Sequence, residues 1–498
     1  MSTFYEVAAQ DPGRVAVIDV DGRETTFGEL SARANQLTHA LRALGLGEGD
    51  GIVAIIHNGL AYYELLLATL QAGIYFTPVN YRSSPAEIAY IAGNSGAKVA
   101  VADADIAATC TEELAALHRF SLGETPGWAD YASWGTDQPT TTPEHRTSGQ
   151  TMLYTSGTTG RPKGVRRALS GQPPALHPIH THTLERLDVL PGHGVHLVAC
   201  PLYHAAPGTF STAILHLGHT LVLMDRFDAE ETLRLTEKHR VTSTHLVPTM
   251  FHRMLRLPDD VRARHDLSSL VSVIHGAAPC PREVKERMLA WLGPVVHEYY
   301  GASEGLITAV HAREWLAEPG TVGKPLDGVR VKVVGDDGEE LPAGETGTLY
   351  FSSAHTKFDY HDDPDKTAAA RSGEFVTVGD VAYLDAAGRV FLCDRRTDLI
   401  LSGGVNIYPA EIEARLLSHP DVADVAVIGE PDPEWGQRVV AVVQPVEGVT
   451  GDSVLAKSLE EHCRAELAGF KTPRRFEFRE RLPRTESGKM LRRTLRAT

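Results

Sequence analysis

Short continuous hydrophobic runs alternate with stretches of helical spacing over the first hundred residues. The pattern predicts, in order, a hairpin at 15–27, a helix at 30–44, a strand at 51–56, a helix at 62–72, a strand at 75–79, a helix at 87–92 and a strand at 98–101. Asp21-Gly22 supplies the turn of the hairpin, and Gly45 supplies a stop signal for the first long helix. Alternation of this kind is typical of an α/β sheet with helices on its faces.

A different organisation is predicted for the rest of the chain. Residues 122–150 are polar and rich in threonine, glycine and proline, which indicates a connection. Alternation then resumes to about residue 301. The remaining predicted elements are strands at 328–334, 347–351 and 388–392, then a helix starting at Pro409, strands at 425–428 and 439–443, and a helix at 455–467. We therefore expect a large N-terminal α/β body with a β-rich subdomain and a small α+β C-terminal domain.

Composition narrows the class of protein. The 498 residues are 42% hydrophobic and 22% charged, which is typical of a globular protein with more than one domain. A formal net charge of −16 argues against a nucleic-acid surface. The five dispersed cysteines indicate reduced thiols and a cytoplasmic protein, and the N-terminus lacks the pattern of a signal peptide. The most apolar stretch, 214–224, is too short for an integral membrane segment.

The most informative segment is a loop rich in glycine and hydroxyl groups that follows an apolar, strand-like lead. It reads Thr155-Ser156-Gly157-Thr158-Thr159-Gly160-Arg161-Pro162-Lys163-Gly164. The glycines let the backbone turn tightly, and the amides, hydroxyls and lysine can surround the phosphates of a nucleotide. It is not a Walker loop, because glycine follows the lysine. A second glycine cluster, 45–49, follows a helix and is interpreted as a helix end.

Further segments follow this loop in a recognisable order. They are 201–207 (PLYHAAP), 276–279 (GAAP), 300–304 (YGASE), 378–380 (VGD), 394–398 (DRRTD), 402–413 (SGGVNIYPAEIE) and 483–489 (PRTESGK). Together with the loop they resemble the adenylating superfamily of acyl- and aryl-CoA synthetases, adenylation domains and luciferases. The resemblance covers nearly the whole chain and implies an N-terminal AMP-binding domain at 1–393, a hinge at 394–398 and a mobile C-terminal domain at 399–498.

The resemblance implies that the protein activates a carboxylic acid with ATP and Mg²⁺ and loads it onto coenzyme A. Attack of a carboxylate on the α-phosphate needs charge neutralisation at phosphorus and at pyrophosphate. The implied catalytic residues are Lys489, Glu304, which would hold Mg²⁺, and Ser303. The implied ATP- and AMP-binding residues are Thr155, Ser156, Gly157, Thr158, Thr159, Gly160, Lys163, Glu298, Tyr299, Asp380 and Arg395. The implied substrate pocket contains Tyr203, His204, Gly276, Ala277, Ala278, Gly301 and Ala302, with Phe210 and Val247 at its border.

For the second half-reaction the resemblance implies that the small domain rotates about Thr397, with Gly403 and Gly404 along the path of the thiol. The chain departs from the family's pattern at Thr397, where relatives commonly carry Asp or Lys. Other departures are Arg166-Arg167 after the phosphate loop, Ser303 in place of threonine and Val378 before Gly379. Three acceptors stay open: coenzyme A, a carrier protein acting in trans, and another nucleophile, with nitrite as an alternative acid. Aromatic and medium-chain fatty acids both stay open as substrates.

Eight histidines gather between residues 177 and 219, namely His177, His180, His182, His193, His196, His204, His216 and His219. No paired spacing typical of a zinc site accompanies them, so packed or hydrogen-bonded rings are the preferred interpretation and no structural zinc is predicted. His204 lies in a motif and is interpreted as a gate of the substrate site. Intact Lys489 and Glu304 argue against a non-catalytic nucleotide sensor.

Overall fold

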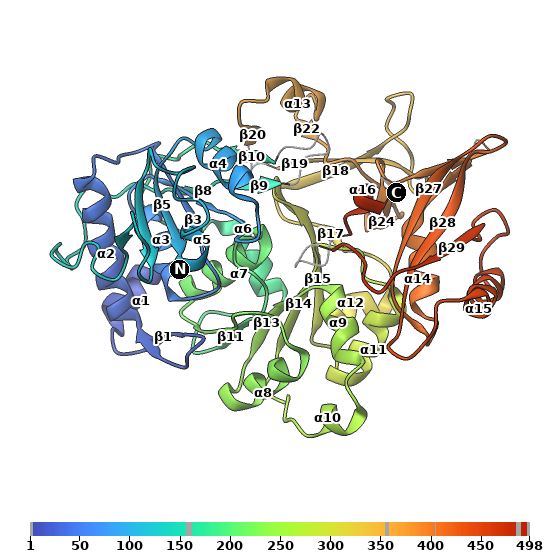
Figure 1. The fold of residues 1–498 in the computed structure, drawn as a ribbon, viewed down its shortest axis with the longest axis horizontal. Coiled ribbons are helices and arrows are strands. Elements are labelled where there is room, and N and C mark those ends of the chain that lie inside the picture. The colour runs from blue at the N-terminus through green and yellow to red at the C-terminus, as the bar shows by residue number, and fades with distance from the viewer. Residues whose placement is uncertain (1–2, 156–161, 354–357, 404, 485–489, 496–498) are drawn as a thin grey trace.

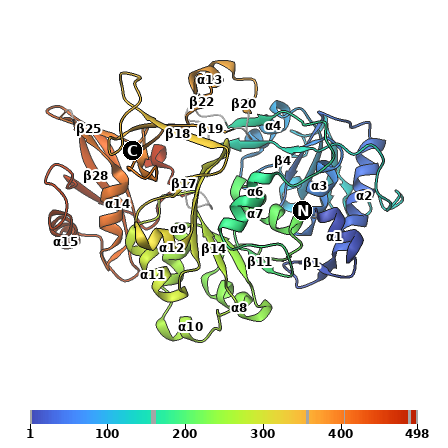
Figure 2. The same cartoon turned by 180° about the vertical axis from the view of Figure 1, so that it is seen from behind.

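The computed structural model describes residues 3–155, 162–353, 358–403, 405–484 and 490–495 (Figure 1). The chain is a mixed α/β protein whose long N-terminal part carries four of its sheets, while the C-terminal part lies to one side with a sheet of its own (Figures 1 and 2). This architecture confirms the predicted fold class. Among the described residues, no helix is both long and apolar enough to cross a membrane.

A six-stranded parallel sheet contains most elements predicted for the first hundred residues. Its order is β7 (Ala129–Asp130), β6 (His118–Leu122), β5 (Ala97–Asp103), β3 (Gly51–Ile55), β4 (Tyr75–Pro78) and β8 (Gln150–Thr151). The helices of this region are α2 (Phe27–Ala43), α3 (Leu60–Leu70), α4 (Pro85–Asn94) and α5 (Ala104–Ala107). Ser84 starts α4 by a reciprocal capping box with Glu87, and Pro85 occupies the first turn.

A nine-stranded sheet forms the centre of the N-terminal part. Its order is β17 (Lys324–Pro325), β16 (Gly305–Val310), β15 (Val296–Ala302), β14 (Ser272–His275), β13 (Ser243–Leu246), β11 (Val195–Val198), β12 (Thr220–Leu223), β1 (Val15–Ile18) and β2 (Glu24–Thr26). The hairpin predicted at 15–27 forms, but β1 pairs in parallel with β12 instead of joining the sheet of its sequence neighbours. The helices are α1 (Phe4–Gln10), α6 (Pro178–Arg186), α7 (Ala205–His216), α8 (Ala229–His239), α9 (Pro248–Leu255), α10 (Asp259–Ala263), α11 (Arg282–Leu292) and α12 (Ala312–Ala317).

Two smaller sheets make up the β-rich region. The first joins β18 (Val329–Val334), β19 (Gly347–Ser353), β21 (Arg371–Ser372), β22 (Phe375–Val376), β23 (Asp380–Leu384) and β24 (Val390–Arg395). The second has the order β20 (Phe358–Tyr360), β10 (Lys163–Arg167) and β9 (Leu153–Thr155), and α13 (Pro364–Ala369) follows β20. Strands β9 and β10 are antiparallel, so the predicted phosphate loop connects the two arms of a hairpin.

The C-terminal part has its own sheet and hydrophobic core. Its strands are β25 (Ile400–Ser402), β26 (Val405–Ile407), β27 (Val422–Asp432), β28 (Gly436–Pro445) and β29 (Arg475–Phe478), and its helices are α14 (Pro409–Leu417), α15 (Ser453–Arg464) and α16 (Arg492–Leu495). Pro409 occupies the first turn of α14, as predicted. Ile412 and Leu416 of that helix are fully buried against the sheet, which gives this part an independent core.

Candidate active site

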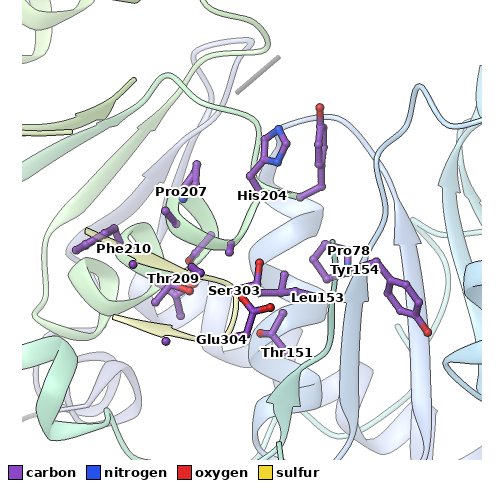
Figure 3. A pocket seen from close by; sticks show the side chains of 18 of the residues that line it. Pro78, Thr151, Leu153, Tyr154, His204, Pro207, Thr209, Phe210, Ser303 and Glu304 are labelled. Atoms are coloured by element: carbon purple, nitrogen blue, oxygen red, sulfur yellow. Dashed lines mark hydrogen bonds between the residues drawn. The ribbon is translucent and has the colours of Figure 1, made fainter. Parts of the chain in front are cut away.

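A cavity of about 970 Å³ opens between the nine-stranded sheet, helices α6 and α7, and the β9–β10 hairpin. Figure 3 shows Ser303 and Glu304 close to Thr151 and Leu153, with His204 at the opposite end from Thr151. Of the residues predicted for the site, the cavity brings together Tyr203, His204, Ala277, Tyr299, Gly301, Ala302, Ser303, Glu304 and Arg395. A volume of this size accommodates a ligand of the size of a drug or a nucleotide.

Glu304 lies in the turn between β15 and β16, and only 6% of it is exposed. Tyr360 of β20 donates its hydroxyl hydrogen to Oε1 of Glu304 over 2.7 Å. Burial and the nearby carboxylate raise the pKa of Tyr360, so the phenol keeps the proton that this bond requires. The result is a fixed, buried carboxylate, and its oxygens are the type of ligand that Mg²⁺ prefers.

The two arginines that depart from the family's pattern have distinct neighbours. Nη2 of Arg167 donates to the backbone carbonyl of Ser303 over 2.6 Å. Burial lowers the pKa of Arg167, while Glu304 opposes that shift. The guanidinium of Arg166 lies over the ring of Tyr75, 4.4 Å from its centroid. Arg167 therefore connects the strand after the phosphate loop to the turn that carries Ser303 and Glu304, a link that no local pattern in the sequence indicates.

Asp380 starts strand β23 and is 7% exposed. Its Oδ2 accepts a hydrogen bond of 2.6 Å from the hydroxyl of Tyr300, and its Oδ1 lies 3.2 Å from Nε of Arg395. Asp380 and Arg395 are also register partners on β23 and β24. Each carboxylate oxygen thus has a partner, which holds the group in one orientation.

Glu298, Gly276 and Ala278, three residues predicted for the nucleotide or substrate site, are not among those that line the cavity, and neither are Lys163 and Asp380. Glu298 instead accepts a hydrogen bond from Nζ of Lys285 over 2.5 Å in a buried ion pair. Gly276 packs so tightly that a Cβ atom there would come within 2.6 Å of the Tyr299 carbonyl. The third residue, Ala278, follows Ala277, whose positive φ of 66° turns the backbone beside the cavity.

The structure describes the predicted phosphate loop only at its two ends. The backbone of Thr155 ends β9, and Lys163 starts β10, where its ammonium forms an ion pair with Asp363. The side-chain hydrogen bond from Lys163 lowers the pKa of Asp363. The predicted residues Ser156, Gly157, Thr158, Thr159, Gly160, Gly404 and Lys489 lie outside the described residues.

The C-terminal part reaches the cavity through Leu491, which is one of its lining residues. Thr397, the predicted hinge, lies exposed in the turn after β24. Gly403 has φ of 58° and donates its N–H to the Trp435 carbonyl over 2.8 Å, and a Cβ atom there would meet the Trp435 ring at 2.7 Å. Glycine at this position is therefore required by both the backbone conformation and the neighbouring indole.

Aromatic rings form one wall of the cavity. The rings of Phe210 and Tyr299 are 4.9 Å apart, and Nε2 of His245 lies 3.1 Å from the Tyr299 hydroxyl. Burial lowers the pKa of His245 to about 3, so its ring is neutral at physiological pH. Tyr203 and His204 also line the cavity, and their ring centroids are 4.3 Å apart. Val247 also lines the cavity.

Within the described ranges, one cluster has the composition of a metal site. Asp188, His297 and His311 place their possible ligand atoms within 4.8 Å of one another. However, Nδ1 of His297 accepts the backbone N–H of Ala312, and Nδ1 of His311 accepts that of Arg313. A neutral ring whose Nδ1 is an acceptor carries its proton on Nε2, and Nε2 of His311 lies 2.8 Å from Oδ2 of Asp188 while Nε2 of His297 lies 3.8 Å from it. The cluster is therefore better explained by hydrogen bonding than by a metal ion.

Comparison with known proteins identifies the family. Residues 4–360 match the model of the AMP-binding enzyme family, and residues 411–489 match the model of its C-terminal domain. A feruloyl-CoA synthase from Amycolatopsis sp. is 36% identical over 479 residues, which cover 94% of this chain and 93% of the relative. The fatty acid–[acyl-carrier-protein] ligase ScoC from Streptomyces coeruleorubidus is 33% identical over 500 residues, which cover 98% and 94%.

The fold agrees with this relationship. The structure of o-succinylbenzoate CoA synthetase from Bacillus subtilis, in complex with an acyl-adenylate intermediate, superposes with a TM-score of 0.83 at 27% identity. The superposition covers 100% of this chain and 98% of the other. The resemblance inferred from the ordered motifs is therefore confirmed. The chain belongs to the AMP-binding enzyme family and is an AMP-forming ligase.

Proposed function

We propose that the protein uses ATP to convert a carboxylic acid into an acyl-adenylate and then transfers the acyl group to the thiol of coenzyme A. In the first step a carboxylate oxygen attacks the α-phosphorus of ATP, and the bond to the pyrophosphate oxygen breaks. In the second step the thiolate sulfur attacks the acyl carbon, and AMP leaves with the bonding electrons. The observation that carries the proposal is the cavity in which Ser303, Glu304 and Arg395 meet.

Glu304 is the residue proposed to hold Mg²⁺, with Ser303 beside the α-phosphate. The fit rests on a buried carboxylate that Tyr360 holds in place by a hydrogen bond of 2.7 Å. When bound, the ion would supply positive charge against the developing charge of the phosphates. Asp380 is proposed to accept hydrogen bonds from the ribose hydroxyls, because Tyr300 and Arg395 fix its orientation. Tyr299, Lys163 and the hydroxyls of 155–160 are proposed to bind the rest of the nucleotide.

Lys489 is proposed to bridge the attacking carboxylate and the α-phosphate. Support comes from Leu491, two residues further along the chain, which lines the cavity. The proposal divides the chain into an N-terminal domain at 1–393, a hinge at 394–398 and a C-terminal domain at 399–498. The C-terminal domain rotates about the exposed Thr397 between the two steps. Gly403 and Gly404 are then placed along the path of the thiol.

The acceptor and the cellular location complete the proposal. The similarity to feruloyl-CoA synthase favours coenzyme A, while the similarity to the ScoC ligase supports a carrier protein acting in trans as the alternative. All five cysteines are free thiols, which is typical of a reducing compartment and supports a cytoplasmic location.

The test is pyrophosphate release from MgATP across a panel of aromatic and fatty acids plus nitrite, with and without coenzyme A. We expect acid-dependent release that coenzyme A accelerates, an acyl-CoA product, and loss of release in Lys489→Ala. If Lys489→Ala still forms the thioester from a supplied acyl-adenylate, the lysine acts in the first step alone. Release that ignores coenzyme A would move the acceptor to a carrier protein or another nucleophile. No release with any acid would contradict the proposed function.

A further inference from the structure

The cavity extends along one face of helix α7. Its lining includes Ala205, Thr209, Thr212, Ala213 and His216, which recur at the spacing of a single helical face. At 1.5 Å per residue this face is about 16 Å long from Ala205 to His216. The residues named on this face before His216 are alanines and threonines, and the larger Phe210 of the same helix lines the cavity next to them. We call the part of the cavity along this face the channel. Because the hydroxyl of Thr212 donates to the Gly208 carbonyl, the channel wall is less polar than its composition indicates.

The N-terminal helix α1 borders the cavity near His216, where the rings of Tyr5 and His216 are 6.4 Å apart. The backbone N–H of Phe4 donates to Nδ1 of His216 over 3.0 Å. The neutral ring of His216 therefore carries its proton on Nε2 and is a hydrogen-bond donor. Tyr5 also lines the cavity, and its own hydroxyl donates to the Leu67 carbonyl over 2.9 Å. Among the described residues, the hydrogen bond that this ring forms is the one at Nδ1, and the side chain lines the cavity.

The lining of the cavity contains a second histidine in addition to His216. His180 of α6 lines the same cavity, and within the described part of the chain its ring forms no hydrogen bond. Burial lowers the pKa of His180 to about 3 and that of His216 to about 4, so both rings are neutral. Two neutral imidazoles that line the cavity offer ring nitrogens to a ligand or to water there.

The charges around these rings are positive. Arg167 contributes to the lowered pKa of His180 by repulsion. The guanidinium of Arg146 lies 4.8 Å from the centroid of the Tyr5 ring, and its Nη1 is buried without a partner among the described groups. Within the described lining of the cavity, the carboxylates are Glu87 and Glu304. A ligand group here meets N–H donors and a positive potential, which favours an oxygen acceptor and disfavours an ammonium group.

We propose that the acid activated by this enzyme is elongated and carries an oxygen acceptor at the end remote from its carboxylate, and that His216, with His180, binds that oxygen. This inference rests on the proposed function and specifies its substrate class. The acceptor is a hydroxyl, a carbonyl or a second carboxylate, since all three offer lone pairs to Nε2–H. An extended chain covers about 1.2 Å per bond, so a channel of about 16 Å spans about 13 bonds and corresponds to acids of about twelve to fourteen carbons.

The experiment compares acids that differ only at the far end: dodecanoic acid, ω-hydroxydodecanoic acid and dodecanedioic acid, with shorter homologues. Acid-dependent exchange between ATP and pyrophosphate is measured in the wild type, His216→Leu, His216→Gln and the exposed control His118→Gln. We expect the wild type to prefer the oxygenated acids over dodecanoic acid about fivefold to tenfold in kcat/KM, the value of one hydrogen bond. The hydroxy acid and the diacid distinguish a neutral from an anionic acceptor.

The preference is read as a ratio within each variant, so a general loss of folded enzyme cancels. His216→Leu should bring the ratio close to one. His216→Gln should keep it, because the amide can accept from Phe4 N–H and still donate to the ligand. A wild type that prefers dodecanoic acid, or a ratio that His216→Leu leaves unchanged, would overturn the inference while leaving the proposed function intact. Absence of exchange with every acid would overturn both.

Discussion

Tyr300 donates its phenolic hydrogen to Oδ2 of Asp380 over 2.6 Å, so a strand of the nine-stranded sheet holds a carboxylate that belongs to the β-rich sheet. Tyr300 follows Tyr299, which lines the cavity, and Asp380 pairs through its other oxygen with Arg395, which also lines it. Two sheets and the strand that leads to the C-terminal part therefore meet at one carboxylate. A substitution that removes one of the partners of the Asp380 carboxylate should therefore alter nucleotide binding more than acid binding.

Tyr300→Phe tests this relationship. The variant removes the hydrogen bond to Asp380 and keeps the ring, and a hydrogen bond to a charged group contributes about 1.5–3 kcal/mol. We expect the KM for ATP to rise by about tenfold or more, with a much smaller change in the KM for the acid. Burial and Asp380 raise the pKa of Tyr300 well above its usual value, so the effect should not vary with pH across the neutral range.

The matched control is Tyr383→Phe, which removes a hydroxyl from the strand that carries Asp380. Steady-state kinetics with each substrate varied in turn give the two KM values. Equal increases in both, or an equal effect of the control, would show that Tyr300 acts on stability and not on the nucleotide site.

Glu304→Gln tests the proposed magnesium site. The amide oxygen can still accept from Tyr360, so the main loss is the negative charge. We expect adenylation to fall by about 100-fold, equivalent to roughly 2.7 kcal/mol of transition-state stabilisation, and the Mg²⁺ concentration for half-maximal activity to rise. A Mg²⁺ titration of pyrophosphate release measures both. The exposed Glu314→Gln is the control, and an unchanged Mg²⁺ midpoint in Glu304→Gln would place the ion elsewhere.

The sequence predicts the elements of this site better than its contacts. The order of motifs and the alternation of strands and helices indicate the fold class, because each signal is local and repeats at the period of its element. The position of the first hairpin is different. β1 pairs with β12, which lies about two hundred residues away, and only tertiary packing selects that partner.

The contacts around the cavity depend on the same kind of distant pairing. The resemblance assigns Glu298 to the nucleotide site, yet its neighbour in the fold is Lys285 of α11, with which it forms a buried ion pair. Arg167 is only a departure from the pattern in the sequence, and its bond to the Ser303 carbonyl depends on how two sheets pack. His216 is one of the histidines scattered between residues 177 and 219. Its tautomer is fixed by Phe4 of helix α1, which lies 212 residues earlier in the chain.

Arg167→Met tests the link to the turn that carries Ser303 and Glu304. The variant keeps the bulk of the side chain but leaves the Ser303 carbonyl without its donor. We expect kcat for adenylation to fall about tenfold, because a small displacement of Ser303 and Glu304 weakens the alignment of the reacting groups. Arg167→Lys, which keeps one charged donor, should recover part of the loss. Arg166→Met is the control, and a loss of the same size there would contradict a specific role for Arg167.

Asp394 lies at the start of the predicted hinge and has an unusual acidity. Burial raises the pKa of its carboxyl to about 6, although Oδ2 accepts the backbone N–H of Ala410 over 2.8 Å. A folded-state pKa above the unfolded value means that the native state binds the proton more tightly. The contribution of this group to stability is therefore greatest at low pH and is lost as the pH rises through about 6. A shift of about two pKa units corresponds to at most about 3 kcal/mol.

Asp394→Asn should remove this dependence, since the amide can accept the same backbone hydrogen bond without ionising. We expect the free energy of unfolding of the variant, relative to the wild type, to increase from about pH 4 to pH 7 by up to about 3 kcal/mol. Urea unfolding of both proteins at intervals across this range measures the difference. The control is Asp365→Asn, at an exposed position in the first turn of α13, and the same measurement is made on it. If the free energies of unfolding of Asp394→Asn and the wild type change with pH in parallel, folding does not raise the pKa of the Asp394 carboxyl and the prediction is wrong.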